Sequence, residues 1–446
     1  AEPTAIPKAE LGPPIAATDG NGPARKKTRS KKKTASNSRK TTSRRRAAAT
    51  VGGITAAATP AGLADWEAAP ATPRIEGVSP RYAPISGPRS LAACGARSGL
   101  GWFRVAWRSR SEGKKLVLPL DAGNRIRFWH DGKPAGTFGV GPDATPGPFP
   151  LKVGRGDQTL TALVQTMGRP SRGNDLDRMT GLSGPLAEVA PLASGRARTV
   201  EVQSMDPFSI RDFIEAAEPG SVRSRQFTWT ITHARRTPVA IHIAGATTPG
   251  FLFVNDAFVG VHAGGTGLGW STHLADPSEE WFKRGRNEIR FAPLESNLGD
   301  GSEVSKALTV YEVTGHLGGD AATWAFEKWA CPADADFIAV TAAEAKRFAG
   351  DPCWWRCRFD LPSADAAEAI RVDLTGMGIG AVMVNGRDLG RFAIAAAGSG
   401  GTAQTRMLIP RSWLKATGNV LAIFDETGAS PASVRVTAGG TGDLDA

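Results

Sequence analysis

Three residues near the middle of the sequence have side chains that could hold a sugar. Trp270 ends the glycine-rich run of HAGGTGLGWSTH (His262 to His273), and Trp281 follows soon after. An indole face can stack on the apolar face of a sugar ring while fixed polar groups bond to its hydroxyls. Trp270, His273 and Trp281 are therefore candidate carbohydrate-binding residues. The alternative is that Trp270 folds back and closes one end of its own domain.

A second group of candidate residues is basic. Between Arg25 and Arg46 the sequence has twelve Lys or Arg and no acid, so the net charge of +11 leaves about −1 for all other residues. Such a stretch could bind nucleic acid, another anionic polymer or an acidic protein surface. The alternative is a solvated leader, and base stacking is not supported because no aromatics are interleaved. The candidate residues are Arg25, Lys26, Lys27, Arg29, Lys31, Lys32, Lys33, Arg44, Arg45 and Arg46.

Other chemistries find no support in the sequence. It has no GxSxG motif, no GxxxxGK[ST] phosphate loop and no CxxC, and only six His. We therefore predict no catalytic residues, no metal and no cofactor, and hence no enzyme. The sequence contains no run of 18 apolar residues, so we predict no membrane-spanning helix.

The four cysteines leave the redox state open. Cys353 and Cys357 would lie about 13 Å apart on one strand, too far to bridge each other. A disulfide between Cys331 and Cys353 and a set of free cysteines, with Cys94 as the fourth, both fit the sequence.

The elements that must position these residues are short strands in a threefold repeat. Each copy begins with an aromatic strand, continues into a strand–turn–strand segment and ends with another strand. The aromatic strands are GWFRVAWRS (101–109), RQFTWTITH (225–233) and CWWRCRFDLP (353–362), and the strand–turn–strand segments are 126–139, 250–262 and 380–392.

The turns of these segments carry the strongest local signal. Asp131-Gly132 and Asn385-Gly386 favour a tight hairpin with positive φ at both central residues, and Asn255-Asp256 is a weaker version. A glycine follows each turn, at 136, 260 and 390, where a β-bulge is expected. Arg387 and Arg391 flank the third turn, where they either contact an anionic partner or are simply solvated.

The predicted fold class is all-β, with three tandem jelly-roll (galactose-binding-like) β-sandwiches behind a disordered basic tail. Residues 1–75 contain few aromatics and much Ala, Pro, Thr and Ser, so they bury too little apolar surface to order themselves. The predicted borders are 1–75 for the tail and 76–195, 196–318 and 319–446 for the sandwiches.

The third repeat resembles a known family. WWRCRFDLP, VDLTGMGIGAVMVNGRDLGRF (372–392), QTRMLIPRSWLKATGN (404–419) and VLAIFDETGASP (420–431) are similar to the C-terminal galactose-binding-like domain of glycoside hydrolase family 35 β-galactosidases. The first repeat resembles an inner jelly roll of these enzymes more weakly. The resemblance implies a sandwich fold and sugar recognition, and Glu426 in FDET resembles an acidic strand end that belongs to the sandwich.

The enzymatic activity of that family does not carry over. These enzymes act through two Glu on a (β/α)₈ barrel, and no stretch of this sequence has the alternating strands and helices of such a barrel. We therefore expect a non-catalytic structural or adhesive component that displays carbohydrate-binding-like sandwiches on a larger assembly, with the virion of a phage or a cell surface favoured as its location.

Several partners and alternatives follow from this expectation. The expected partners are other subunits of that assembly, glycans, and an acidic partner or nucleic acid for the basic tail, without membrane insertion. The main alternative is a soluble carbohydrate-binding accessory module or the non-catalytic part of a β-galactosidase. A hydrolase with an unrecognised site is the third hypothesis.

Overall fold

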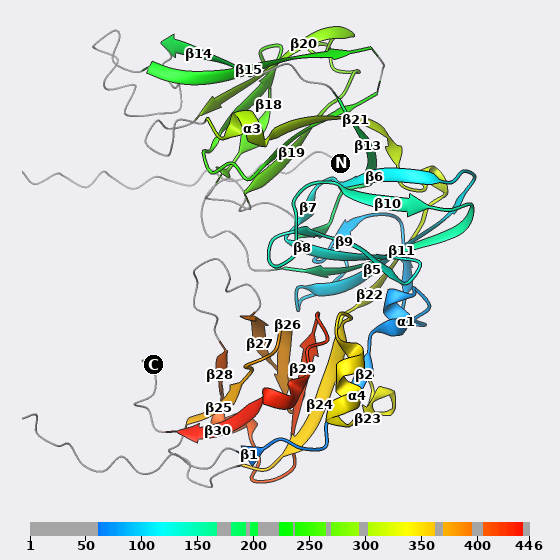
Figure 1. Ribbon diagram of the computed structural model, residues 1–446, viewed down its shortest axis with the longest axis vertical. Coiled ribbons are helices and arrows are strands. Elements are labelled where there is room, and N and C mark those ends of the chain that lie inside the picture. The colour runs from blue at the N-terminus through cyan, green and yellow to red at the C-terminus, as the bar shows by residue number, and fades with distance from the viewer. Residues whose placement is uncertain are drawn as a thin grey trace, which may run out of the picture. The chain divides into compact units, whose positions relative to one another are not determined.

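A computed structural model describes most of the chain after residue 60. The described residues are 61–166, 180–192, 197–203, 223–234, 237–264, 269–293, 302–361, 369–394 and 405–439. They are almost entirely β-structure, as predicted, and the strands pair antiparallel (Figure 1). None of the helices in these ranges is long and apolar enough to cross a membrane.

The first sandwich packs a six-stranded sheet against three strands of a second sheet. The first sheet has the order β3 (Ala83–Ile85), β22 (Thr323–Lys328), β5 (Leu100–Ser109), β11 (Gly156–Gln165), β8 (Arg125–His130), β9 (Lys133–Gly139). The facing strands are β10 (Phe149–Val153), β6 (Gly113–Pro119) and β13 (Leu186–Pro191). A small sheet of β4 (Arg89–Ser90), β12 (Gly181–Leu182) and β7 (Ala122–Gly123) adds Leu182 and Ala122 to the same core.

The second sandwich shares a sheet with the first. Strand β13 pairs with β6 on one side and with β21 on the other, so β10-β6-β13-β21-β16-β19 form one continuous sheet. The second sandwich contributes three strands to this sheet: β21 (Leu308–His316), β16 (Val239–Ala244) and β19 (Trp270–Ala275). The short helix α3 (Val304–Ala307) comes before β21. Facing them is the order β14 (Arg198–Gln203), β15 (Arg223–His233), β20 (Gly285–Pro293), β17 (Gly250–Val254), β18 (Ala257–His262).

The third sandwich packs a six-stranded sheet against a four-stranded one. The first has the order β23 (Ile338–Ala339), β2 (Glu67–Pro70), β24 (Cys353–Phe359), β29 (Asn419–Asp425), β26 (Ile379–Val384), β27 (Arg387–Ala393). The second is β1 (Ala61–Gly62), β30 (Arg435–Gly439), β25 (Ala369–Asp373), β28 (Arg406–Ile409). The short helices are α1 (Thr72–Ile75), α4 (Ala342–Ala345) and the 3₁₀ turns η3 (Gly319–Ala321), η4 (Asp334–Asp336), η5 (Lys346–Phe348), η7 (Arg411–Trp413) and η8 (Pro431–Ser433).

Strands cross between the sandwiches at two places. Residues 61–75, which composition assigns to the tail, form β1, β2 and α1, and β2 pairs with β24 of the third sandwich. Strand β22, which follows the predicted border at 318, pairs with β5 of the first sandwich. Small apolar residues explain the first difference, because Ala68 and Ala69 bury completely between larger neighbours. The borders between the modules otherwise remain predictions.

The three predicted hairpin turns form with the expected geometry. Asp131 and Gly132, Asn255 and Asp256, and Asn385 and Gly386 all have positive φ. Each hairpin also has a β-bulge beside the predicted glycine, where the strand register shifts next to the pairs that involve Gly136, Gly260 and Gly390. This local prediction is confirmed because turn chemistry depends on the residues of the turn themselves.

The second and third turns are fastened by the same side-chain network. In the second, the Asn255 amide donates to the Trp281 carbonyl and to Asn287 Oδ1, both at 2.7 Å. In the third, Asn385 donates to the carbonyl of Trp413 and to Asn419 Oδ1, at 2.8 and 2.9 Å. The equivalence of these contacts supports the repeat.

We predict that Asn385→Ala destabilises the protein by about 2–3 kcal/mol, because alanine is strained at positive φ and two acceptors lose their donor. Asn385→Gly loses the same hydrogen bonds but tolerates positive φ, so it should destabilise less than Asn385→Ala. Urea unfolding followed by tryptophan fluorescence measures both variants, and an Asn385→Ala protein as stable as the parent would contradict the role of this network.

All four cysteines are free thiols in the structure. Burial raises the pKa of Cys331 to about 11 and that of Cys357 to about 12, and it raises the pKa of Cys353 further. We expect Ellman's reagent to find no reactive Cys353 or Cys357 at pH 8 in the folded protein and four thiols after unfolding. A count of two thiols in the unfolded protein would show that a disulfide such as Cys331–Cys353 exists.

Candidate functional site

The structure places Trp270 in the interior. Its side chain is 3% exposed, at the start of β19, and it belongs to the core of the first sandwich. It meets the ring of Phe138 edge-on, with 5.6 Å between centroids. The predicted binding platform at Trp270 is not supported by this position, because no face of the ring is exposed to a sugar. The glycine-rich lead-in suggested a loop, but the strand begins at Trp270 itself.

His273 and Trp281 lie in different surroundings. His273 is on β19 and its ring lies against Gly260 so closely that a Cβ there would come within 2.3 Å of Nδ1. Trp281 is half-buried and packs against the core of the second sandwich, with its ring edge-on to Phe282. The structure therefore does not bring the three predicted residues together into one site.

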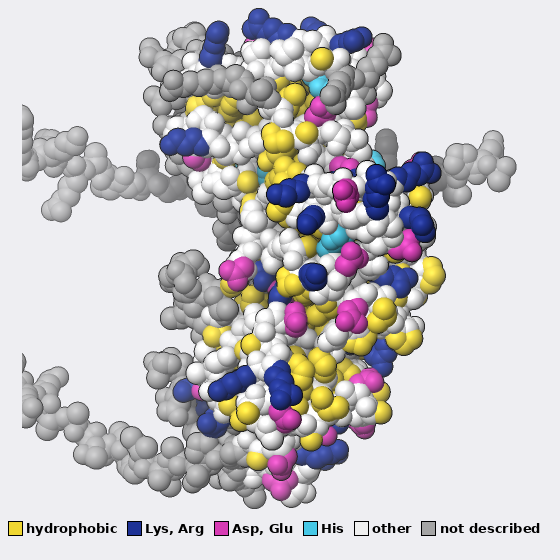
Figure 2. Space-filling view, turned by 45° about the vertical axis from the view of Figure 1, so that its right-hand side comes forward, with side chains coloured by type: hydrophobic (Ala, Val, Ile, Leu, Met, Phe, Trp, Pro, Cys, Tyr) yellow, Lys and Arg dark blue, Asp and Glu magenta, His cyan; other side chains and the backbone are white. Residues whose placement is uncertain are grey.

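The basic candidates Arg25 to Arg46 lie outside the described residues. Within the described surface, Figure 2 shows Lys and Arg side chains on the same face as Asp and Glu, with hydrophobic side chains between them. This mixture agrees with the nearly neutral charge that the sequence leaves outside the basic stretch.

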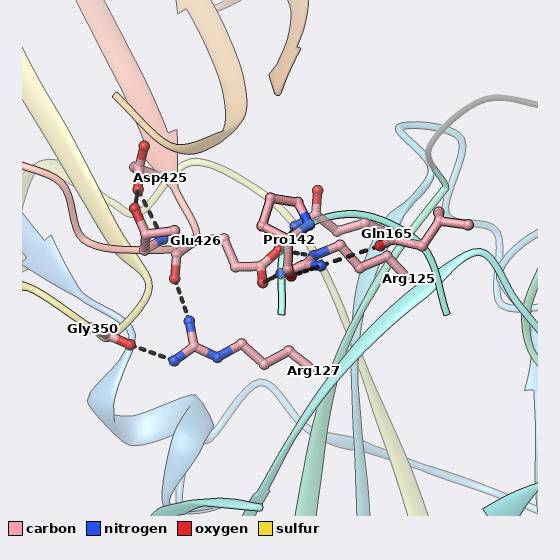
Figure 3. Close-up of polar contacts among 9 residues, drawn as sticks. Arg125, Arg127, Pro142, Gln165, Gly350, Asp425 and Glu426 are labelled. Carbon is pink, nitrogen blue, oxygen red and sulfur yellow. Dashed lines mark hydrogen bonds and ion pairs between the residues drawn. The ribbon is translucent and has the colours of Figure 1, made fainter. Parts of the chain in front are cut away.

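The most completely buried polar cluster joins the first and third sandwiches. Glu426, fully buried directly after β29, accepts hydrogen bonds from Arg125 of β8 at 2.8 Å from Nη2 and 3.0 Å from Nε (Figure 3). Gln165 of β11 donates to the same carboxylate, and Arg125 Nη1 donates to the carbonyls of Val140 and Pro142. A buried ion pair is stable only when its remaining hydrogen-bonding groups are also matched.

Two further arginines link the same sandwiches. Arg127 donates to the backbone carbonyl of Glu426 at 2.8 Å and to the carbonyl of Gly350 (Figure 3). Burial lowers the pKa of Arg127, and the charge of Glu426 opposes that shift. Arg391 of β27 donates to the carbonyls of Thr166 and Ser98, so it serves a contact within the protein rather than the anionic partner considered for it.

An aromatic layer fills the space between the facing sheets of these sandwiches. Trp102 contacts Trp129 on the first-sandwich side, at 5.6 Å between centroids. On the other side Trp354 stacks on Trp329 at 4.8 Å and contacts Phe424 at 5.4 Å. One continuous buried cluster holds all five rings. The consecutive aromatics of GWF and CWW indicate this layer. A strand buried on both faces has consecutive apolar residues, whereas a half-exposed strand alternates apolar and polar ones.

The buried carboxylates of the described residues have structural partners. Glu327 accepts from Arg74 Nε and Ser79 Oγ, each at 2.7 Å. Asp425 accepts from the backbone of Gly378 at 2.7 Å and from Thr427, and burial nevertheless raises its pKa. In the part of the chain that the structure describes, no three His, Cys, Asp or Glu side chains are grouped so as to hold a metal ion.

The third hairpin places an arginine over a half-buried tryptophan. Asn385 fixes the backbone of Trp413 in η7, as described above, and the Arg387 guanidinium lies 5.6 Å from the centre of the Trp413 ring. The side chain of Arg387 is exposed. An indole ring that is partly open to solvent, with a planar donor group over it, is an arrangement that can hold a sugar. Trp413 is not among the residues predicted from the sequence. Its spacing to Asn419 repeats that of Trp281 to Asn287, and this repeat is the signal that could have identified it.

We predict that Glu426→Ala destabilises the protein by about 3–5 kcal/mol, because it leaves the buried Arg125 without a counter-charge. The double variant Arg125→Met/Glu426→Met should recover most of this loss, since no charge is then left uncompensated. Thermal and urea unfolding measure both.

The control is Asp157→Ala, which removes an exposed partner of Arg108 whose side chain is itself 80% exposed. It should change stability by no more than about 0.5 kcal/mol. Equally small effects for Glu426→Ala and Asp157→Ala would contradict the importance of the buried pair.

Part of the third sandwich is similar in sequence to known proteins. Residues 352–419 match the family model described as the galactose-binding domain of β-galactosidase. β-Galactosidase 8 of Arabidopsis thaliana is 33% identical over 112 residues, covering 20% of this chain and 13% of that protein. β-Galactosidase 11 of Oryza sativa subsp. japonica is 38% identical over 84 residues, covering 19% of this chain and 10% of that protein.

Among solved structures, a GH2 β-galacturonidase from Eisenbergiella tayi covers 66% of this chain and 39% of its own, at 9% identity and a TM-score of 0.20. A similarity this low supports no argument about function. The family-model match, by contrast, covers β24 to the start of β29 and includes Arg387 and Trp413. Over residues 352–419 the third sandwich is thus similar to the galactose-binding domain of β-galactosidases, and the chain spans only about a tenth of the length of these relatives.

Proposed function

We propose that this chain is a non-catalytic carbohydrate-binding component, equivalent to an accessory part of a β-galactosidase. The observation that carries the proposal is the galactose-binding domain match over residues 352–419. The matched segment contains the half-buried Trp413, whose backbone carbonyl accepts from Asn385 and whose ring has the Arg387 guanidinium over it.

The sugar would bind at Trp413 and Arg387. The indole ring supplies a face for the C–H groups of galactose, and the five N–H donors of the guanidinium match its hydroxyl groups. The backbone of η7 is fixed by the Asn385 hydrogen bond, so little conformational freedom is lost there when the ligand binds.

The non-catalytic part of the proposal rests on the carboxylates. A retaining glycosidase needs two carboxyl groups about 5–5.5 Å apart on either side of the sugar. The buried Glu327 and Glu426 are each paired with an arginine and bonded to a further polar side chain, Ser79 for Glu327 and Gln165 for Glu426. The matched family is, in addition, a binding domain.

A second candidate is a component that displays these sandwiches on a larger assembly, such as a virion or a cell surface. The twelve unopposed basic residues between Arg25 and Arg46 favour it, because a free sugar-binding module has no evident need for them. Light scattering of the intact chain and of a chain that lacks residues 1–55 tests this candidate. Assembly that depends on those residues would favour it over a free accessory module.

The main experiment titrates the intact protein with galactose by isothermal calorimetry. We predict that Trp413→Ala and Arg387→Ala each weaken binding at least about tenfold, about 1.4 kcal/mol. The matched control is Trp281→Ala, which changes the equivalent tryptophan of the second sandwich, where Ala257 replaces the arginine. An intact protein that does not bind galactose, or that hydrolyses a nitrophenyl β-galactoside, would contradict the proposal.

A further inference from the structure

The outer face of the second sandwich carries an exposed aromatic cluster. Phe258 of β18 is 57% exposed, and its ring lies 6.0 Å from that of Phe251 and 5.9 Å from that of Phe253. Phe251 and Phe253 alternate along β17 with the fully buried Leu252 and Val254, so their rings are on the outer side of the sheet. A large aromatic side chain left in water is one of the features that mark a binding surface.

Polar side chains continue this cluster across the sheet. Phe258 pairs with Phe253 in the strand register, Phe253 pairs with Arg290 of β20, and Arg290 pairs with Thr228 of β15. Because neighbouring strands are about 4.8 Å apart, the row from Phe258 to Thr228 extends for about 14 Å. We name these four residues the aromatic row.

Arg290 contacts several side chains in and beside the aromatic row. Its guanidinium lies 4.1 Å from the centre of the Phe253 ring and donates to Gln226 Oε1 at 3.4 Å and to Asp256 Oδ1 at 3.3 Å. Asp256 balances its charge, so the row offers hydrogen-bonding groups and ring faces rather than a net field. That combination does not fit a nucleic acid or another strongly charged partner.

We infer that the aromatic row is a second carbohydrate site, which takes a neutral polysaccharide chain lying across the strands. The phenylalanine rings can contact the C–H faces of linked sugar rings, and the planar amide and guanidinium groups can bond to their hydroxyls. The length of the aromatic row exceeds that of one sugar ring. The inference rests on the proposed function, since it assumes that carbohydrate is the ligand of this chain.

The test compares galactose with β-1,4-galactan on the intact protein. Phe258→Ala and Arg290→Lys should each weaken galactan binding about tenfold and leave galactose binding unchanged. Phe258 is largely exposed, so its replacement should not affect folding, which circular dichroism verifies. The control is Val78→Ala, an exposed apolar side chain far from this sheet in sequence, which should affect neither ligand.

The outcomes separate this inference from the proposed function. Galactose binding without galactan binding, or galactan binding that Phe258→Ala leaves intact, overturns the inference alone. Galactan binding that depends on Phe258, without galactose binding at Trp413, supports the inference and overturns the site proposed for the third sandwich. A parent protein that dimerises through this face, with dimers lost in Phe258→Ala and no galactan bound, overturns the inference in favour of a second copy.

Discussion

The buried pair of Arg125 and Glu426 is the constraint on which the arrangement of the first and third sandwiches depends. A carboxylate removed completely from water is strongly unfavourable unless a counter-charge and further donors replace the solvent. Here Arg125 and Gln165 supply them from two adjacent strands of the first sandwich, 301 and 261 residues away in sequence. The pair can form only in one relative position of the two sheets, so it selects that position among all those that the apolar layer would allow.

The apolar layer and the strands that cross between the sandwiches hold the first and third sandwiches together, and the ion pair fixes their relative position. Five aromatic rings fill the space between the facing sheets, and β22 and β2 carry the chain between the sandwiches. The second sandwich is joined to the first differently, through one continuous sheet that crosses β13. The two proposed sugar sites, at Trp413 and at the aromatic row, lie on different sandwiches of this framework.

The sequence predicted the local parts of this structure well and the distant contacts poorly. The hairpin turns at Asp131, Asn255 and Asn385 and their bulges follow from residues adjacent in sequence, which explains why they were predictable. The partnership of Glu426 with Arg125 carries no local signal, and neither does the exchange of β22. Trp270 lies in the interior and not in a binding loop, because the glycines before it, which resemble a loop, lead directly into a strand. The row at Phe258 has no such signal, because every residue after the glycine in GFLFV is apolar, and this pattern fits a strand buried on both faces equally well.

The central claim is that the first and third sandwiches form one cooperative unit, and differential scanning calorimetry of the intact protein tests it most directly. Sandwiches that merely follow each other along a chain unfold as separate units, each with its own transition. The account predicts a single transition for the described part of the chain, with a calorimetric enthalpy close to the van't Hoff enthalpy. Two resolved transitions, one of which persists unchanged when Glu426 is replaced by alanine, would contradict it.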